Sequence, residues 1–239
     1  MFEIACRELL QILRNRVVLV TGLIIPVAFG AYVIYRHESI SEIGSLGFVA
    51  AVVLFAVMAL GLYATAVTTL ASRRQDLFLK RLRSTAATDR DILAGLLLPL
   101  TVVALIQVGA ILTVLGVVAA SPAQIPLLVV AVLATAAMMV ALALATTGLT
   151  NSPEHAQVTT LPVSLLLIAV ASWVGITGMT DFTLVKRLLP GGSATQLVVN
   201  AWDGGVPLAD SLPLLLPTVG WVGVAVALAG RLFRWEPRR

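Results

Sequence analysis

The sequence LGFVAAVVLFAVMALGLYATAVTTLA, residues 46–71, contains no charged residue and no histidine. A helix of these 26 residues would extend for about 39 Å at 1.5 Å per residue, more than the roughly 30 Å of hydrocarbon in a bilayer. An apolar run of this length is typical of a transmembrane helix and too long for a core helix of a small soluble domain. We therefore predict that the chain crosses a membrane here.

The rest of the chain repeats this pattern. Only 12% of its 239 residues are charged and 59% are hydrophobic, whereas a soluble domain carries about 25% charged residues. One cysteine and two histidines leave little for a disulfide framework or a metal site. We predict a single transmembrane domain over residues 1–239, an all-α integral membrane protein of six transmembrane helices whose other five spans are 17–35, 92–119, 125–149, 157–177 and 212–235.

The positions of lysine and arginine predict the orientation. Loops on the cytoplasmic side of a membrane protein carry an excess of these residues. With the N-terminus inside, thirteen of the sixteen lysines and arginines fall on the cytoplasmic side, and the outside receives only Arg36, Lys186 and Arg187. We therefore expect both termini in the cytoplasm.

Helix caps mark several boundaries. Thr88 and Asp91 form a capping box before the third span, with Asp91 placed to reach back to Thr88. Ser121-Pro122 and Ser152-Pro153 each have the form of a cap residue before a proline at the first helical position. We expect helices to begin at these points.

Two amphipathic segments precede spans on the cytoplasmic side. Residues 1–16 place Phe2, Cys6, Leu9 and Leu13 on one helical face and predict an interfacial helix. Residues 72–88 combine a stripe at helical spacing (Leu79, Leu82, Ala86) with a dense basic set: Arg73, Arg74, Lys80, Arg81 and Arg83. From spacing alone, two interpretations of this second segment are equally good. It is either a basic loop that touches anionic lipid or a helix that binds a partner.

Residues 178–211, between the last two spans, predict structure on the outer side. Two apolar pieces flank the break Pro190-Gly191-Gly192, and Ser193 to Gln196 have the form of another capping box. We expect two short helices that dip into the outer leaflet as an outer gate, with the two glycines as its flexible point, although a plain surface hairpin also fits. Trp173 and Trp202 are expected at the headgroup level, where indole rings prefer to lie.

The sequence lacks the motifs of several functional classes. Neither lysine belongs to a G-x-x-x-x-G-K-[ST] loop, so a nucleotide site of the P-loop type is excluded. The spans contain no Asp, Glu or His away from their ends, which disfavours an ion-coupled transporter. An intramembrane protease would need Ser193 near His155, which our topology places at opposite faces, and a metal-dependent lipid transferase would need more than Asp203. A membrane anchor or assembly subunit stays open as a further alternative.

The sequence resembles the membrane subunits of the ABC-type-2 exporter permease family. The resemblance covers nearly the whole chain: the interfacial helix, six spans with both ends inside, and an outer Leu189-Pro190 before the last span. After the second span, the chain has Arg73-Arg74, then LKRLRSTA at residues 79–86 and ILAG at residues 92–95. Arg73, Leu77 and Ala86 stand where family members often have Glu, Gly and Pro.

The resemblance implies a function and partners. Residues 72–88 would be the coupling helix, which binds an ABC ATPase subunit present in two copies, with ATP and Mg²⁺ on that partner and no cofactor in this chain. A second copy or a related permease would complete the pathway, with the second and fifth spans facing each other at Leu54 and Leu166.

The apolar spans suit an amphipathic or lipophilic compound moved out through a bacterial plasma membrane. The fourteen arginines against two lysines suggest a GC-rich bacterium. No nucleic-acid partner is expected.

Overall fold

A computed structural model describes residues 20–84, 88–150 and 152–233, and every regular element in these ranges is helical. The first span is represented by η1 (Val20–Ile24) and α3 (Ile25–Tyr35), which the short α4 (His37–Ser41) follows. The remaining elements in chain order are α5 (Leu46–Ala56), η2 (Val57–Tyr63), α6 (Ala64–Gln75), α7 (Phe78–Arg83), α8 (Asp89–Val118), α9 (Ile125–Thr147), α10 (Pro153–Thr177), α11 (Thr183–Leu188), α12 (Gly192–Asp203), α13 (Leu208–Ser211), η3 (Leu212–Leu214) and α14 (Leu215–Leu232).

Five helices are long and apolar enough to cross a membrane. They confirm the predicted spans from the second to the sixth within a few residues, and they run over Leu46–Gln75, Asp89–Val118, Ile125–Thr147, Pro153–Thr177 and Leu208–Leu232. The described part of the first span is the shorter apolar helix Gly22–Tyr35. The predicted interfacial helix over residues 1–16 lies outside the described residues.

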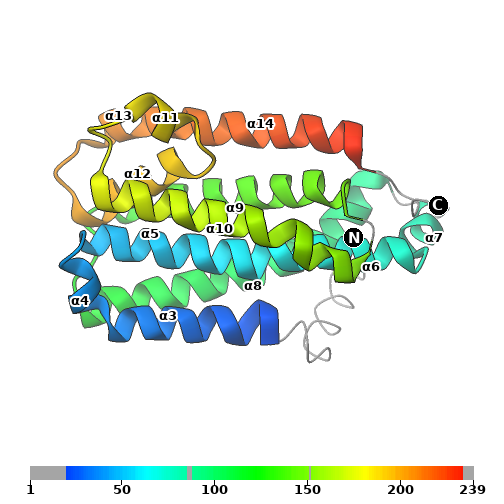
Figure 1. Cartoon of the computed structure of the whole chain (residues 1–239), viewed down its shortest axis with the longest axis horizontal. Coiled ribbons are helices and arrows are strands. Elements are labelled where there is room, and N and C mark those ends of the chain that lie inside the picture. The colour runs from blue at the N-terminus through cyan, green and yellow to red at the C-terminus, as the bar shows by residue number, and fades with distance from the viewer. Residues whose placement is uncertain (1–19, 85–87, 151, 234–239) are drawn as a thin grey trace.

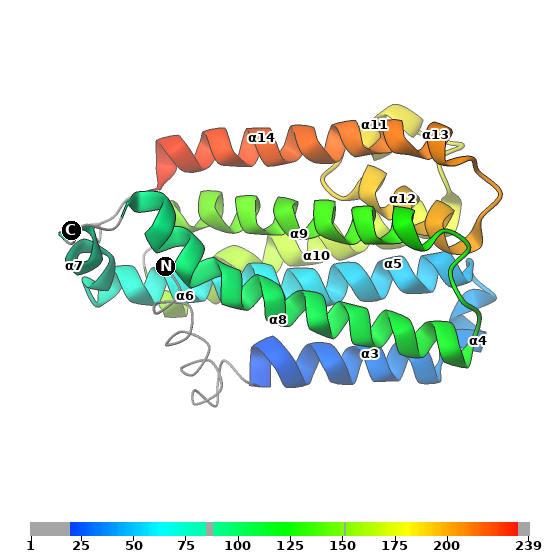
Figure 2. The same cartoon turned by 180° about the vertical axis from the view of Figure 1, so that it is seen from behind.

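The second span is the centre of the bundle (Figure 1). It is one continuous helix made of α5, η2 and α6, and 83% of its most apolar stretch is buried, against 22% for the sixth span. Four of the other spans surround it, with α10 and α12 packed on α5, α9 on η2 and α6, and α3 and α8 on the remaining side, whereas α14 packs on α9 and α12 (Figures 1 and 2). Small residues such as Gly47, Ala50 and Gly61 permit this close approach.

This central position contradicts the arrangement expected for two copies. Leu54 is fully buried within its own chain, so the second span cannot face a second copy at that residue in this structure. The small residues of the second span serve packing inside one chain. At Gly47, for example, a Cβ atom would lie 2.8 Å from the Val199 Cα atom.

Two π-helical stretches meet near the middle of the bundle, since η1 and η2 are in contact. The buried Gln107 of α8 donates from its side-chain amide to the Leu23 carbonyl at 3.2 Å. This bond joins the first and third spans, the interhelical role expected for a buried polar group in a membrane bundle. By contrast, the Thr68 hydroxyl donates to Ala64 of its own helix.

The helix caps are partly as predicted. The Asp91 amide donates to the Thr88 hydroxyl oxygen at 3.2 Å, and that hydroxyl donates to the Asp91 carboxylate at 2.6 Å. The Ser152 oxygen likewise accepts from the amide of His155. The prediction for Ser121-Pro122 is wrong, because α9 begins only at Ile125. The amides of residues 123 and 124 instead donate to carbonyls at the end of α12, which holds this turn out of the helix.

Candidate functional site

The basic segment after the second span is a bent turn and not the single helix predicted over residues 72–88. The central helix continues to Gln75, and Leu77 then adopts φ +56° before α7 begins at Phe78. The Arg81 guanidinium donates to the Asp76 carbonyl at 3.1 Å across this bend. Figure 1 shows α7 beyond the end of the bundle, where it packs against α6 and α8. We call residues 73–84 the basic turn, and its end of the bundle the basic end.

Part of the predicted contact surface faces the protein's own interior. Leu79 is fully buried, and Leu82 packs against the core. Arg74 is 2% exposed and donates to the Thr147 carbonyl at 3.1 Å and to the Thr150 carbonyl. These carbonyls belong to the C-terminal end of α9, where cations are favoured by unpaired acceptors and by the helix dipole. Arg74 and Leu79 therefore hold the turn in place, and both side chains are buried within the chain.

The outward side of the basic turn carries exposed charge. Arg81 is exposed, and Leu77 is 46% exposed at the tip of the bend. The Arg73 guanidinium lies 5.2 Å from the ring centre of Phe78, within the range of a cation–π contact. The side chains of Lys80 and Arg83 lie outside the described residues. A partner that approaches this end would meet Arg81 and Leu77.

The opposite end of the bundle carries the predicted outer gate. The structure has two short helices there, α11 and α12, separated at residues 189–191. Helix α12 does not begin with the capping box read at Ser193, since it starts at Gly192 with Gly191 as its cap at φ +90°. Nine of its twelve residues are buried. The segment is therefore packed into the bundle between α5, α9 and α10.

The two glycines are explained by close packing rather than by flexibility. A Cβ atom on Gly192 would lie 1.8 Å from the Lys186 carbonyl oxygen, which is backbone and cannot move aside alone. On Gly191 it would lie 2.7 Å from the Phe55 ring. The flexible point that we expected at this pair has no support in the structure. Pro190 precedes the pair and is half-buried.

The two tryptophans have different surroundings. Trp202 is 3% exposed and belongs to the core, so it cannot lie among lipid headgroups as predicted. Trp173 is 37% exposed and lies near Phe182, with 6.3 Å between ring centres. The Lys186 ammonium lies 5.2 Å from the Trp173 ring centre and donates to the Thr177 hydroxyl oxygen and the Gly178 carbonyl, at 2.8 and 2.7 Å. Lys186 is fully buried, a position that the sequence did not indicate.

The residues of the two enzymatic alternatives lie apart. His155 is exposed in the first turn of α10, whereas Ser193 is buried and follows Gly192, which lies beside Val170 in the later part of that helix; Ser193 donates to the Arg187 carbonyl at 3.4 Å. The Asp203 carboxylate accepts from the Gly47 amide at 2.8 Å, so it caps the start of α5. A serine–histidine pair is therefore not assembled by this fold.

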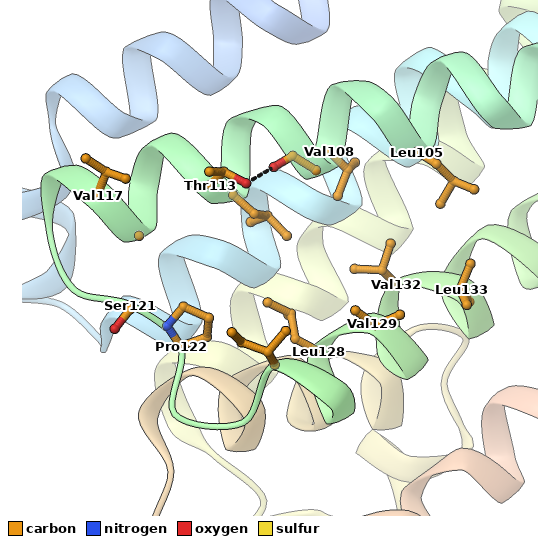
Figure 3. A pocket seen from close by; sticks show the side chains of 14 residues that line it. Leu105, Val108, Thr113, Val117, Ser121, Pro122, Leu128, Val129, Val132 and Leu133 are labelled. Atoms are coloured by element: carbon orange, nitrogen blue, oxygen red, sulfur yellow. Dashed lines mark hydrogen bonds between the residues drawn. The ribbon is translucent and has the colours of Figure 1, made fainter.

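A cavity of about 530 Å³ lies between α8 and α9, next to the turn that joins them. Figure 3 shows Leu105, Val108 and Thr113 of α8 facing Leu128 and Val132 of α9 across it. All but two of the fourteen lining residues are apolar or glycine. The sequence does not predict this cavity, because it depends on how α8 and α9 pack against each other.

Comparisons with family models, with curated proteins and with solved structures find no match for this chain.

Proposed function

We propose that this chain is the membrane-spanning permease subunit of an ATP-driven ABC exporter, with six spans and both termini in the cytoplasm. The proposal is supported most directly by the basic turn, a separate short helix placed beyond the end of an apolar bundle. ATP hydrolysis would occur on a separate ATPase subunit, with two copies in the complex and a second permease copy or a related permease beside this one. The cargo would be an amphipathic or lipophilic compound that leaves through a bacterial plasma membrane.

The contacts of the basic turn favour the transmission of force. The turn continues directly from the central helix, so a push on α7 would act on the element that contacts nearly every other span. Arg74 ties the same turn to the end of α9 through two carbonyls. A lipid-binding loop would not need this connection to the middle of the bundle.

The charge pattern supports the orientation. Arg81 and Arg90 are exposed at the basic end, whose loops also hold Arg73, Lys80 and Arg83. Exposed basic side chains are retained on the cytoplasmic face of membrane proteins. The opposite end, with its packed helices α11 to α13, would then face the outside and close the pathway there.

The test is a charge reversal at the basic turn in the intact chain. We expect Arg81→Glu combined with Arg83→Glu to remove co-purification of a P-loop ATPase from native membranes and to abolish substrate-stimulated ATP hydrolysis. The matched control is Arg187→Glu, which reverses an exposed arginine on α11 at the opposite end. The control should keep both properties.

Two results would contradict the proposal. One is full ATPase binding and stimulation in the double variant when the protein is present in the membrane at normal amounts. The other is an equal loss in Arg187→Glu, which would mean that the effect comes from net charge and not from the basic turn. The complete absence of a P-loop ATPase from native preparations would favour a membrane anchor instead.

A further inference from the structure

The cavity between α8 and α9 has the form of a groove that opens sideways. Its floor consists of buried side chains, among them Val108 and Leu112 of α8 and Leu128 of α9. Its rim is exposed, with Val117 at 81% and Val129 at 50%. In a helix that crosses a membrane, exposed apolar side chains of this kind contact lipid. The groove is therefore a hollow in the surface that faces the bilayer.

The lining changes from apolar to polar along the groove. No charged side chain lines it, and the Thr113 hydroxyl already donates to the Gly109 carbonyl at 2.7 Å (Figure 3). The other hydroxyl is that of Ser121, which is exposed on the turn where the helices end. An occupant would thus place a polar part at this turn and a hydrocarbon part between the helices.

Two glycines shape the hollow on the α8 side. Gly109 and Gly116 are seven residues apart, two helical turns, and so lie on the same face of α8. No atom lies within 4 Å of the position of a Cβ on Gly109. The absence of a side chain at Gly109 leaves open space along the helix, and at Gly116 it lets the turn at Ser121 and Pro122 lie close to α8 and narrow the groove. This shape suits a flexible unbranched chain.

We infer that this groove binds one acyl chain of a membrane phospholipid, with the lipid headgroup at the turn of residues 119–124. The surrounding bilayer supplies such chains at a far higher concentration than it supplies any protein segment. The groove is also continuous with the exposed apolar surface of both helices, including Ile106, Val114 and Val118. A lipid can therefore enter sideways from the bilayer. This site is separate from the basic turn and does not depend on the proposed transport function.

The experiment uses the full chain in vesicles of phosphatidylglycerol and phosphatidylethanolamine. A small fraction of phosphatidylcholine carries a photoreactive diazirine in the middle of one acyl chain, and labelled peptides are identified by mass spectrometry after irradiation. We expect labelling to concentrate on the groove residues of α8 and α9 relative to α14, although the span that contains α14 is less buried than either of these helices. Gly109→Leu adds a side chain at a position where a Cβ meets nothing within 4 Å outside its own helix backbone, and it should lower the groove labelling several-fold.

The matched control is Gly223→Leu on α14, where a Cβ also has no neighbour within 4 Å. This control should leave the groove labelling unchanged. Thr113→Leu narrows the same groove and replaces Gly109→Leu if that variant accumulates poorly. Even labelling of α8, α9 and α14, or groove labelling that survives both substitutions, would overturn the inference. Disulfide cross-linking between copies through Val117→Cys, with no lipid label in the groove, would assign it to a second copy instead.

Discussion

Each end of this bundle has one buried cation at the end of a helix, but the two ends differ in what surrounds it. At the basic end, Arg74 donates to the carbonyl of Thr147, the last residue of α9, and to that of Thr150 in the turn after it, and α7 next to it exposes Arg81. At the opposite end, Lys186 donates to Thr177 and Gly178 at the end of α10, and α12 beside it is largely buried.

The same physical solution therefore supports two different surfaces. A cation that satisfies C-terminal carbonyls lets a helix end inside the protein without leaving its acceptors unpaired. At the opposite end, the cation supports α12, which is largely buried, while the other residues of α11 stay exposed or partly exposed. At the basic end, it fixes the position of the turn while its outward side stays exposed. We interpret the opposite end as a structural closure and the basic end as a surface for a partner.

The largest expected effect is at the packed end. Gly192→Ala would force the new methyl group against the Lys186 carbonyl oxygen, and the required backbone shift should lower the free energy of unfolding by about 3 kcal/mol. Thermal unfolding in detergent would measure this loss. Gly220→Ala, at an open helical position of α14, is the control and should leave stability unchanged or slightly raised. Equal stability of the two variants would show that the opposite end is loosely packed.

Removal of either buried cation should have the next largest effect. Arg74→Met removes the guanidinium that donates to the buried residues Thr147 and Thr150, which should cost about 2 kcal/mol of unfolding free energy. Lys186→Met should cost less, because its acceptors belong to the exposed Thr177 and the half-buried Gly178. The two variants should differ in ATPase coupling at temperatures where both are folded. We expect only Arg74→Met to weaken ATPase coupling, because only Arg74 positions the basic turn. If Lys186→Met uncouples transport equally, the two ends do not act separately.

The smallest expected effect concerns two residues in left-handed conformations. Leu77 (φ +56°) lies at the basic end and Phe182 (φ +53°) at the opposite end. A left-handed conformation costs roughly 1–2 kcal/mol for a residue with a side chain, so Leu77→Gly should raise stability slightly. Phe182→Gly should gain less, because it also loses the contact with Trp173. Chemical unfolding of both variants would measure the difference, and a larger gain for Phe182→Gly would contradict this account.

Hydrophobicity predicted the spans well, because a membrane helix must be apolar along its whole length. It did not predict which span is central. The second span and the fourth are both apolar throughout, and only tertiary packing shows that Leu54 is enclosed by other helices. The bend at Leu77 was also missed, because leucine carries no signal for a left-handed conformation, and the helical spacing of Leu79, Leu82 and Ala86 favoured a continuous helix.

The predicted site residues differ in burial, and their spacing in the sequence does not show which of them are buried. Arg74 and Arg81 look alike in the sequence, but one is 2% exposed and the other is exposed. Gly191 and Gly192 suggested flexibility, whereas their neighbours Phe55 and Lys186 come from elsewhere in the chain and make close packing the reason. Lys186 was read as a loop residue, because nothing local shows that an ammonium will reach the end of α10.

The central claim is that the basic turn, and not the opposite end, contacts an ATPase. The most direct measurement places a photoreactive amino acid at Leu77 in one variant and at Val185 in another, two exposed positions of similar burial at the two ends. After irradiation of native membranes, cross-linked partners are identified by mass spectrometry. We predict a P-loop ATPase cross-linked from position 77 and none from position 185. A P-loop ATPase captured only from position 185, or from neither position, would contradict the account.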